Sequence, residues 1–297
     1  MEQELSVVLE KYSYFECPRW HENRIWVSDF YTHQVLSARA DGSDVRIEAE
    51  VPGQPSGLGW LPDGRLLVIS QHDNRLLRRE TDGSLVTHAD LTDHVTGEPN
   101  DMVVDEQGRA FVGNFGFDLM EGAPVETAAL LRVDPDGSVT AVADDLWFPN
   151  GAVITDDSVL LVDETFGNRV TAFDIGADGS LANRRVWASF GELPTDRDLQ
   201  TALGQLSVGP DGCGLDAEGA LWIADALSGR VLRVREGGEI ADQISVGTGG
   251  FACMLGGEDG RTLFLCTAPD FDRTARSAAR EASLLATRVE VPHGGRP

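Results

Sequence analysis

Residues 149–162 contain the stretch that decides the fold: Pro149-Asn150-Gly151-Ala152-Val153-Ile154, then a polar turn, then Leu160-Leu161-Val162. The same order of a polar or small residue, an apolar run, a turn and a second apolar run occurs six times along the chain. The position of Asn150 is filled, in chain order, by Glu16, Ser56, Asn100, Asn150, Asp211 and Ala252. Successive copies lie about 40–60 residues apart, a period that favours propeller blades of about four short strands each.

The repeat predicts an all-β fold: a six-bladed β-propeller with four-stranded antiparallel blades and a central metal site, in a single domain over 1–297. Asp-Gly pairs such as Asp41-Gly42 and Asp136-Gly137 mark the turns between strands. A strand at 5–9 is expected to close the ring by pairing with the last blade, whose third strand is expected at 284–291, because closure protects the sheet edges. Residues 292–297 are expected to form a tail.

The composition excludes some partners. The formal net charge is −25 at pH 7, which repels phosphate backbones and argues against nucleic acid and against anionic membranes. No apolar stretch approaches the ~20 residues of a membrane span, and the first residues lack the basic and apolar regions of a signal peptide. We therefore expect a cytoplasmic protein, a monomer or a small homo-oligomer, that acts on a small molecule.

The four cysteines do not have the spacing of a metal finger. Cys17, Cys213 and Cys253 fall within two residues of the repeated position, and Cys266 follows in an apolar run. They are expected to be small buried side chains near the axis and not disulfides.

The repeated position brings oxygen ligands together if the repeats surround one axis. Glu16 and Asp211 supply carboxylates, and Asn100 and Asn150 supply neutral carbonyl oxygens. Such ligands favour a hard divalent cation, Ca²⁺ first, with Mg²⁺, Mn²⁺ or Zn²⁺ as alternatives. For any one of these residues a polar cap on an inner strand is the simpler interpretation, but four at one repeat position favour a metal site.

The alternation of strand direction predicts which residues share a face with this ring. His72 and Phe115 are expected on that face, and so are the long segments 117–129, 190–209 and 270–283, which either cover a central pocket as a lid or only decorate the surface. A lone histidine in such a place is more often a rim residue than a base. Asp101 follows Asn100 and is expected to brace it.

Four short motifs carry a resemblance to a known family. They are Glu16-Cys17-Pro18-Arg19-Trp20, Pro99-Asn100-Asp101, Phe148-Pro149-Asn150-Gly151 and Pro210-Asp211-Gly212. From Glu16 to about Val291 the chain resembles the senescence-marker-protein/gluconolactonase/luciferin-regenerating family, a group of propellers with a divalent cation at the axis.

The resemblance implies a set of roles. Glu16, Asn150 and Asp211 would ligate the metal, and Asn100 would ligate it directly or hold a substrate oxygen through water. Asp211 would also act as the general base in the hydrolysis of a lactone, and some members of the family act on phosphoesters. Sugar-lactonase members usually carry a basic residue two positions before this asparagine, where this chain has Glu98.

The departure at Glu98 puts gluconolactone-type substrates in doubt and favours a less polar lactone or ester. Asn100, Glu98, His72 and Phe115 are the predicted substrate-binding residues. Asp211 is the predicted catalytic residue, either as the base that takes a proton from the attacking water or as a direct nucleophile. Two alternatives to a metal-dependent hydrolase remain open: a binding propeller with a structural calcium ion, and a biosynthetic enzyme with a non-hydrolytic step such as isomerisation or cyclisation.

Overall fold

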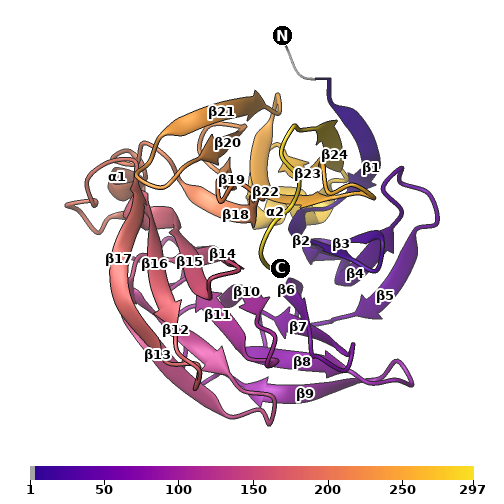
Figure 1. Ribbon diagram of the computed structural model, residues 1–297, viewed down its shortest axis with the longest axis horizontal. Coiled ribbons are helices and arrows are strands. Elements are labelled where there is room, and N and C mark those ends of the chain that lie inside the picture. Colours follow the sequence, from indigo (N-terminus) through magenta and orange to yellow (C-terminus); the bar gives the residue numbers. More distant parts are fainter. Residues whose placement is uncertain (1–3) are drawn as a thin grey trace.

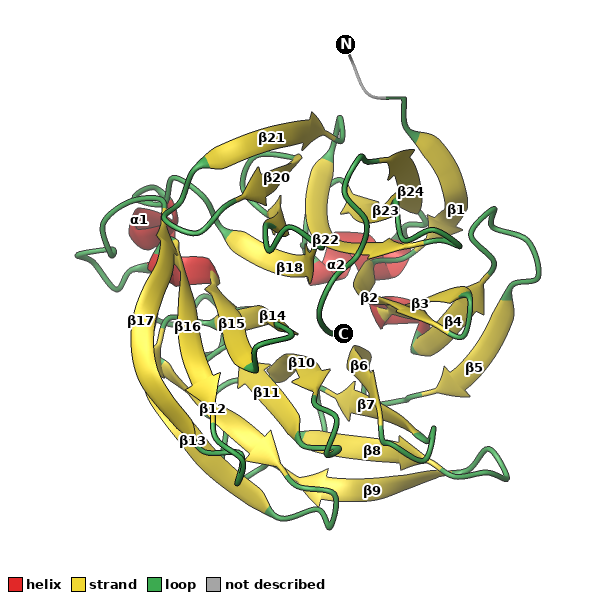
Figure 2. Cartoon of the chain, viewed as in Figure 1, coloured by secondary structure: helices red, strands yellow, loops and turns green. Residues whose placement is uncertain are grey.

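A computed structural model describes residues 4–297 of the chain. Six four-stranded antiparallel sheets surround a central axis, and each runs from an inner strand to an outer strand at the rim (Figures 1 and 2). The predicted all-β, six-bladed propeller is confirmed.

The first three blades follow one another directly along the chain. They contain β2 (Phe15–His21), β3 (Arg24–Asp29), β4 (Gln34–Ala38) and β5 (Arg46–Glu50); β6 (Pro55–Trp60), β7 (Leu66–Ser70), β8 (Arg75–Arg79) and β9 (Leu85–Asp90); and β10 (Pro99–Val104), β11 (Ala110–Asn114), β12 (Ala128–Val133) and β13 (Val139–Leu146).

The last three blades have the same plan, except that the sixth borrows its outer strand from the start of the chain. They contain β14 (Pro149–Ile154), β15 (Val159–Glu164), β16 (Arg169–Ile175) and β17 (Leu181–Ser189); β18 (Pro210–Leu215), β19 (Leu221–Asp225), β20 (Arg230–Val234) and β21 (Ile240–Ser245); and β22 (Gly249–Gly256), β23 (Thr262–Ala268), β24 (Ala282–Arg288) and β1 (Ser6–Tyr12).

The ring closes as predicted, because β1 pairs with β24. The third strand of the last blade begins and ends earlier than the expected 284–291: Val289 has left the sheet and donates its backbone N–H to the carbonyl of Arg261. Short helices interrupt the connections on the ring face: η1 (Phe30–Thr32), η2 (Thr165–Gly167), α1 (Leu199–Leu203) and α2 (Arg273–Ala278).

The repeated position lies at a register shift in every inner strand. The pairing of β14 with β15, for example, jumps from Pro149 to Ala152, which leaves Asn150 and Gly151 in a bulge. Shifts in the second, third and fifth blades likewise leave the repeated residue unpaired. In the first and sixth blades the shift lies directly beside Glu16 or Ala252, which keep their partners Ser28 and Cys266. A bulge re-aims a side chain relative to the regular alternation of a strand. This local irregularity accompanies the four repeated positions that line the central cavity, Glu16, Asn100, Asn150 and Asp211.

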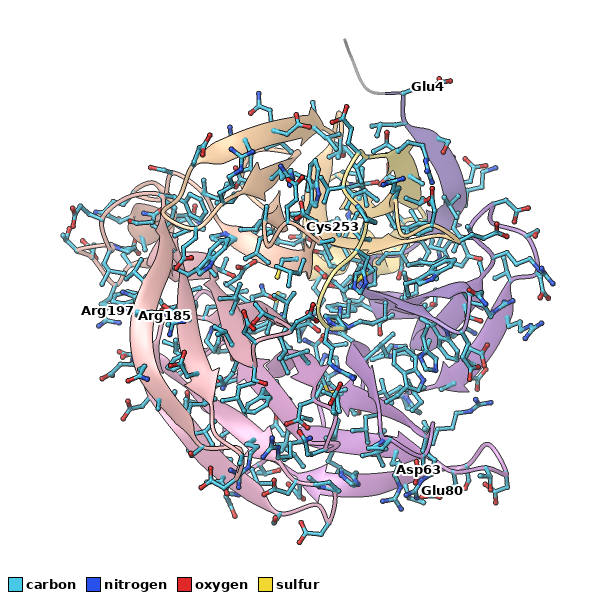
Figure 3. All side chains as sticks on the ribbon, viewed as in Figure 1. Glu4, Asp63, Glu80, Arg185, Arg197 and Cys253 are labelled. Atoms are coloured by element: carbon cyan, nitrogen blue, oxygen red, sulfur yellow. The ribbon has the colours of Figure 1, made fainter. Side chains whose placement is uncertain are left out.

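Apolar side chains fill the space between neighbouring blades. One cluster joins Val153 and Leu161 of the fourth blade to Leu221, Ile223 and Leu232 of the fifth. The four cysteines are buried and free, as predicted, and Cys253 lies near the axis, whereas Asp63, Glu80 and Arg185 lie at the rim (Figure 3).

Residues 292–297, expected to form a tail, lie outside the last sheet and are held against the propeller. The segment crosses the end of the axis opposite to the ring of repeated residues (Figure 1). Ile154 and Arg296 exchange two backbone hydrogen bonds of 2.8 Å, and Gly294 donates to Leu215. Sequence patterns did not reveal this docking because it depends on backbone groups at the ends of β14 and β18.

No helix within residues 4–297 has the length and apolar character needed to cross a bilayer.

Candidate active site

The four predicted metal ligands come together at one end of the axis. Glu16 comes from β2, Asn100 from β10, Asn150 from β14 and Asp211 from β18, and all four line one cavity of about 80 Å³. Each of the four is at most 8% exposed. The structure thus brings together the four residues that the repeat pattern singled out.

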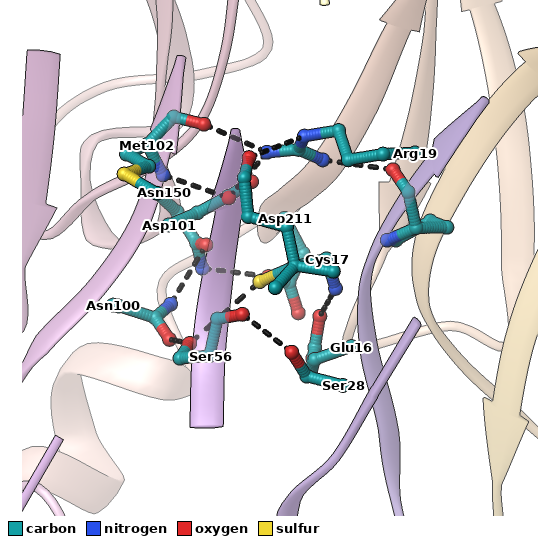
Figure 4. A network of polar contacts seen from close by, with 12 residues as sticks. Glu16, Cys17, Arg19, Ser28, Ser56, Asn100, Asp101, Met102, Asn150 and Asp211 are labelled. Atoms are coloured by element: carbon teal, nitrogen blue, oxygen red, sulfur yellow. Dashed lines mark hydrogen bonds and ion pairs between the residues drawn. The ribbon is translucent and has the colours of Figure 1, made fainter. Parts of the chain in front are cut away.

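A chain of side-chain hydrogen bonds links four positions of the ring (Figure 4). Ser56 Oγ donates to Asn100 Oδ1 at 2.9 Å, and Gln71 Nε2 donates to the same oxygen at 3.1 Å. Asn100 Nδ2 donates to Asn150 Oδ1 at 2.9 Å, and Asn150 Nδ2 donates to Asp211 Oδ1 at 2.6 Å. Each amide is thus held in a defined orientation by its neighbours.

The two asparagines differ in what they can still offer. A carbonyl oxygen has two lone pairs. Both lone pairs of Asn100 Oδ1 are engaged by Ser56 and Gln71, whereas Asn150 Oδ1 accepts one bond. Asn150 therefore keeps acceptor capacity for a cation. Asn100 keeps one N–H of its amide free of the hydrogen bonds found in residues 4–297, which suits it to hold an oxygen atom of a substrate.

The two carboxylates of the ring are buried without a positive partner. Burial raises the pKa of Glu16 well above its usual value, and the nearby charges of Asp211 and Asp101 raise it further. Burial likewise raises the pKa of Asp211, with Asp101 and Asp163 adding to the effect. Across residues 4–297 no Arg, Lys or His forms an ion pair with either group. Two buried acids in this state are stabilised by a bound cation.

The donor set fits a hard cation. Over the described part of the chain, no three His, Cys, Asp or Glu side chains converge as a metal cluster. The converging oxygens of the ring are instead two carboxylates and two amides, the kinds of ligand that Ca²⁺ and Mg²⁺ take in proteins.

Asp101 was expected to brace Asn100, but its side chain has other partners. Its carboxylate forms an ion pair with Arg19, whose side chain is 3% exposed, and accepts a hydrogen bond from the backbone of Met102. Arg19 also donates to the carbonyls of Pro18, Leu58 and Met102. Four of the five N–H donors of Arg19 are thus engaged, and within residues 4–297 its guanidinium forms an ion pair with Asp101 and with neither Glu16 nor Asp211.

The walls of the cavity are mostly apolar, and the three long segments contribute to them. Leu119 and Met120 come from 117–129, Leu203 from α1, and Phe271 from the segment before α2. Two of these segments are joined, because Val125 donates its backbone N–H to the carbonyl of Arg197 at 2.7 Å. All three predicted cover segments thus contact the cavity.

The remaining predicted residues lie beside the ring. Phe115 lines the central cavity, but His72 and Glu98 line a neighbouring groove of about 510 Å³ that also contains Phe115. Glu98 forms an ion pair with Arg273 of α2 at 3.1 Å. The position at which the resemblance expects a positive charge thus carries a negative one, and a guanidinium from another element lies against it.

The chain matches the model of a known family over most of its length. Residues 15–269 match the SMP-30/Gluconolactonase/LRE-like region. The chain belongs to this family. The resemblance stated from the four motifs is therefore confirmed.

Relatives of known name span nearly the whole chain. The chain is 26% identical to the 6-deoxy-6-sulfogluconolactonase of Pseudomonas putida, covering 95% of this chain and 93% of that protein. It is 27% identical to the pentonolactonase XacC of Haloferax volcanii, covering 95% and 92%. Among solved structures it is similar to the calcium-binding protein regucalcin from Agrobacterium tumefaciens, with a TM-score of 0.79 and 21% identity over 100% of this chain and 97% of that chain. The family and these lactonase relatives support lactone hydrolysis at the level of the family.

Sequence reasoning placed Thr165, which lines the cavity, on the ring face, but it did not single out Tyr14, Tyr31 or Arg273. Tyr14 and Tyr31 line the cavity, and Arg273 lines the groove. Tyr14 lies two residues before the repeated position Glu16, so its place on the ring face was a usable signal. Arg273 had no such signal, because its partner Glu98 is 175 positions away along the chain.

Proposed function

We propose that this chain is a divalent-cation-dependent lactone hydrolase with its active site in the central cavity. The observation that carries the proposal is the pair of buried carboxylates, Glu16 and Asp211, beside two amide side chains and without a positive partner in residues 4–297. Relatives named as lactonases support the substrate class. A structural neighbour named as a calcium-binding protein supports Ca²⁺ as the ion, with Mg²⁺, Mn²⁺ and Zn²⁺ as alternatives.

Glu16, Asn150 and Asp211 would hold the cation, with Asn100 as a fourth, weaker ligand because its carbonyl oxygen already accepts two bonds. When bound, such an ion polarises the carbonyl group of a substrate and favours the ionised forms of neighbouring acids.

Asp211 would act as the general base. Its Oδ1 accepts the hydrogen bond of Asn150, which fixes the carboxylate and leaves the other oxygen to take a proton from an attacking water. The Asn150 amide is fixed by a further contact, because its Nδ2 also donates to Thr165 Oγ1 at 3.1 Å. The free N–H of Asn100 would orient an oxygen of the lactone.

The apolar walls contribute a second part of the function. Phe148, Phe166 and Phe251 lie around the cavity above the polar ring. They would hold the hydrocarbon part of a lactone ring and reduce the amount of bulk water at the reacting carbonyl, which strengthens the electrostatic interactions there.

The proposal is tested with a panel of lactones and aryl esters, with chelator and then with each of the four dications added back. We expect chelation to abolish acid release and Ca²⁺ to restore it. Incorporation of oxygen from isotope-labelled water into the product would identify hydrolysis. Cation binding without turnover of any compound would instead favour a binding propeller.

The Asp211→Asn variant tests the base. We expect a loss of about 10²–10⁴-fold in kcat, the usual contribution of a general base. Asp178→Asn, at an exposed turn where the Asp178 side chain accepts hydrogen bonds only from Ser180 within the described residues, is the matched control and should keep full activity. Full activity in Asp211→Asn, with cation still bound, would exclude this role.

A further inference from the structure

The groove lies directly beside the central cavity. The groove has a volume of about 510 Å³ and shares Phe115, Leu119 and Met120 with the cavity wall. A molecule whose reacting carbonyl lies over the ring of Glu16 and Asp211 would reach the groove by passing these three side chains. The chemistry of the groove then bears on which molecule the site accepts.

Arg273 lies at the junction of the two spaces. It is the first residue of α2, which begins after Asp272, whose side chain accepts the N–H of Ala275 at 2.7 Å. The helix packs on η1, and Tyr31 of η1 lines the central cavity. Burial raises the pKa of Tyr31 to about 12, while the adjacent Arg273 acts against this rise.

The Arg273 guanidinium is held by Glu98 but keeps N–H donors without a partner in residues 4–297. Its Nη2 donates to both carboxylate oxygens of Glu98, at 3.1 and 3.3 Å. Its Nε is buried and has no hydrogen-bond partner within residues 4–297. The side chain remains 36% exposed. An arginine has five N–H donors, so several are left for a ligand in the groove.

The groove alternates donors and acceptors and has little net positive charge. Glu98 neutralises Arg273, and Asp118 adds a negative charge. His72 Nε2 lies 3.7 Å from Glu98, and burial lowers the pKa of His72, which favours its neutral form. An anion would meet two carboxylates here, whereas a hydroxyl group can donate to an acid and accept from the guanidinium at once.

We propose that the groove binds a hydroxyl-bearing substituent of the lactone, and that Arg273, positioned by Glu98, determines this specificity. The inference rests on the proposed function and deepens it. The lactone ring occupies the apolar cavity over the cation ligands, and the polar substituent points outward between His72, Glu98 and Arg273.

The test compares two substrates that differ by one group: δ-valerolactone, and its analogue with a hydroxymethyl group on the carbon next to the ring oxygen. We expect the unchanged protein to prefer the analogue by about tenfold or more in kcat/KM, the scale of one hydrogen bond to a charged group. Arg273→Ala should remove this preference mainly through a higher KM, and Arg273→Lys should restore part of it.

Two further variants separate specificity from folding. Glu98→Gln keeps the shape of the anchor and removes its charge, so it should also lower the preference. Arg280→Ala is the matched control, because Arg280 is exposed and bonds only backbone carbonyls of Ser277 and Ala279 within the described residues. It should leave the preference unchanged.

The outcomes are distinct. Hydrolysis of neither lactone by the unchanged protein would contradict the proposed function, and with it this assignment. Hydrolysis of both with equal kcat/KM, or a preference that survives in Arg273→Ala and Glu98→Gln, would overturn the role of the groove and leave the lactonase standing.

Discussion

At the scale of single residues, two buried acids of the ring lower the stability of the metal-free fold and are kept for the proposed function. Glu16 and Asp211 line the same cavity and are buried, so ionisation of either is costly. A protein that only had to fold would gain by replacing them with neutral side chains. Their presence at two of the six repeat positions is therefore best explained by a bound cation.

The first prediction follows from the sign of these pKa shifts. A group whose folded pKa is raised contributes stability that is present below its unfolded pKa and is lost as the pH rises through the folded pKa. The raised pKa of Glu16 and of Asp211 should therefore make the chelated protein lose their contribution as the pH rises from about 4, the usual value of such acids, through their higher folded pKa values. Added Ca²⁺ should reverse this loss and raise Tm more at pH 8 than at pH 5.

Thermal unfolding with chelator and with Ca²⁺ measures the effect. An ion at 100 times its Kd stabilises by about 2.7 kcal/mol, or roughly 4 °C in a chain of this size. Glu16→Gln isolates one acid from the histidines and surface carboxylates that also titrate: with chelator at pH 8 it should unfold at a higher temperature than the unchanged protein, and it should gain less from Ca²⁺. The prediction fails if the variant and the unchanged protein respond alike to pH.

At the scale of elements, the irregular inner strands bring the repeated residues together in one cavity. The backbone after the ring residue approaches the next inner strand so closely that a side chain would collide with it. A Cβ on Gly151 would lie 2.4 Å from the carbonyl oxygen of Asp211, and one on Gly212 would lie 2.4 Å from Cβ of Ala252. The glycines of the motif are therefore required by the packing of β14 on β18 and of β18 on β22.

Gly151→Ala should accordingly destabilise the protein by about 1–3 kcal/mol, the usual cost of overpacking. It should also weaken cation binding, because the added methyl group displaces the backbone of Asp211. Urea unfolding and calcium titration measure the two effects. Gly204→Ala is the control, since its Cβ would meet only carbonyl oxygens at 3.5 Å. Equal stability and equal calcium affinity in the two variants would contradict the argument.

The inner strands also explain which parts of the candidate site could be predicted from the sequence. The ring residues were predictable because they recur at one position of a repeat whose apolar runs form the inner strands. The segments that build the cavity wall carry no repeat, so α1 and α2 were expected only as parts of long loops. The contact of Glu98 with Arg273 depends on where those loops pack, and no local pattern encodes that.

At the scale of the whole molecule the two ends of the axis are different. The ring side chains and the cavity lie where the inner strands begin, and residues 292–297 cross the end where they finish (Figure 1). The cavity therefore opens on one side, under α1, α2 and the segment 117–129. A propeller with both ends open would let water reach the buried acids from below.

This arrangement predicts the effect of removing residues 293–297. Four backbone hydrogen bonds would be lost: two between Ile154 and Arg296, one from Gly294 to Leu215 and one from His293 to Gly260. At about 0.5–1.5 kcal/mol for each hydrogen bond, the free energy of unfolding should fall by about 2–6 kcal/mol, seen as a lower urea midpoint.

Arg296→Ala is the control, because it keeps the backbone bonds and removes only an exposed ion pair with Glu106, which contributes about 0–1 kcal/mol. A truncated protein that unfolds at the same urea concentration as Arg296→Ala would show that the docked segment does not stabilise the propeller, because the backbone groups of Ile154 and Leu215 would then be satisfied equally well by water.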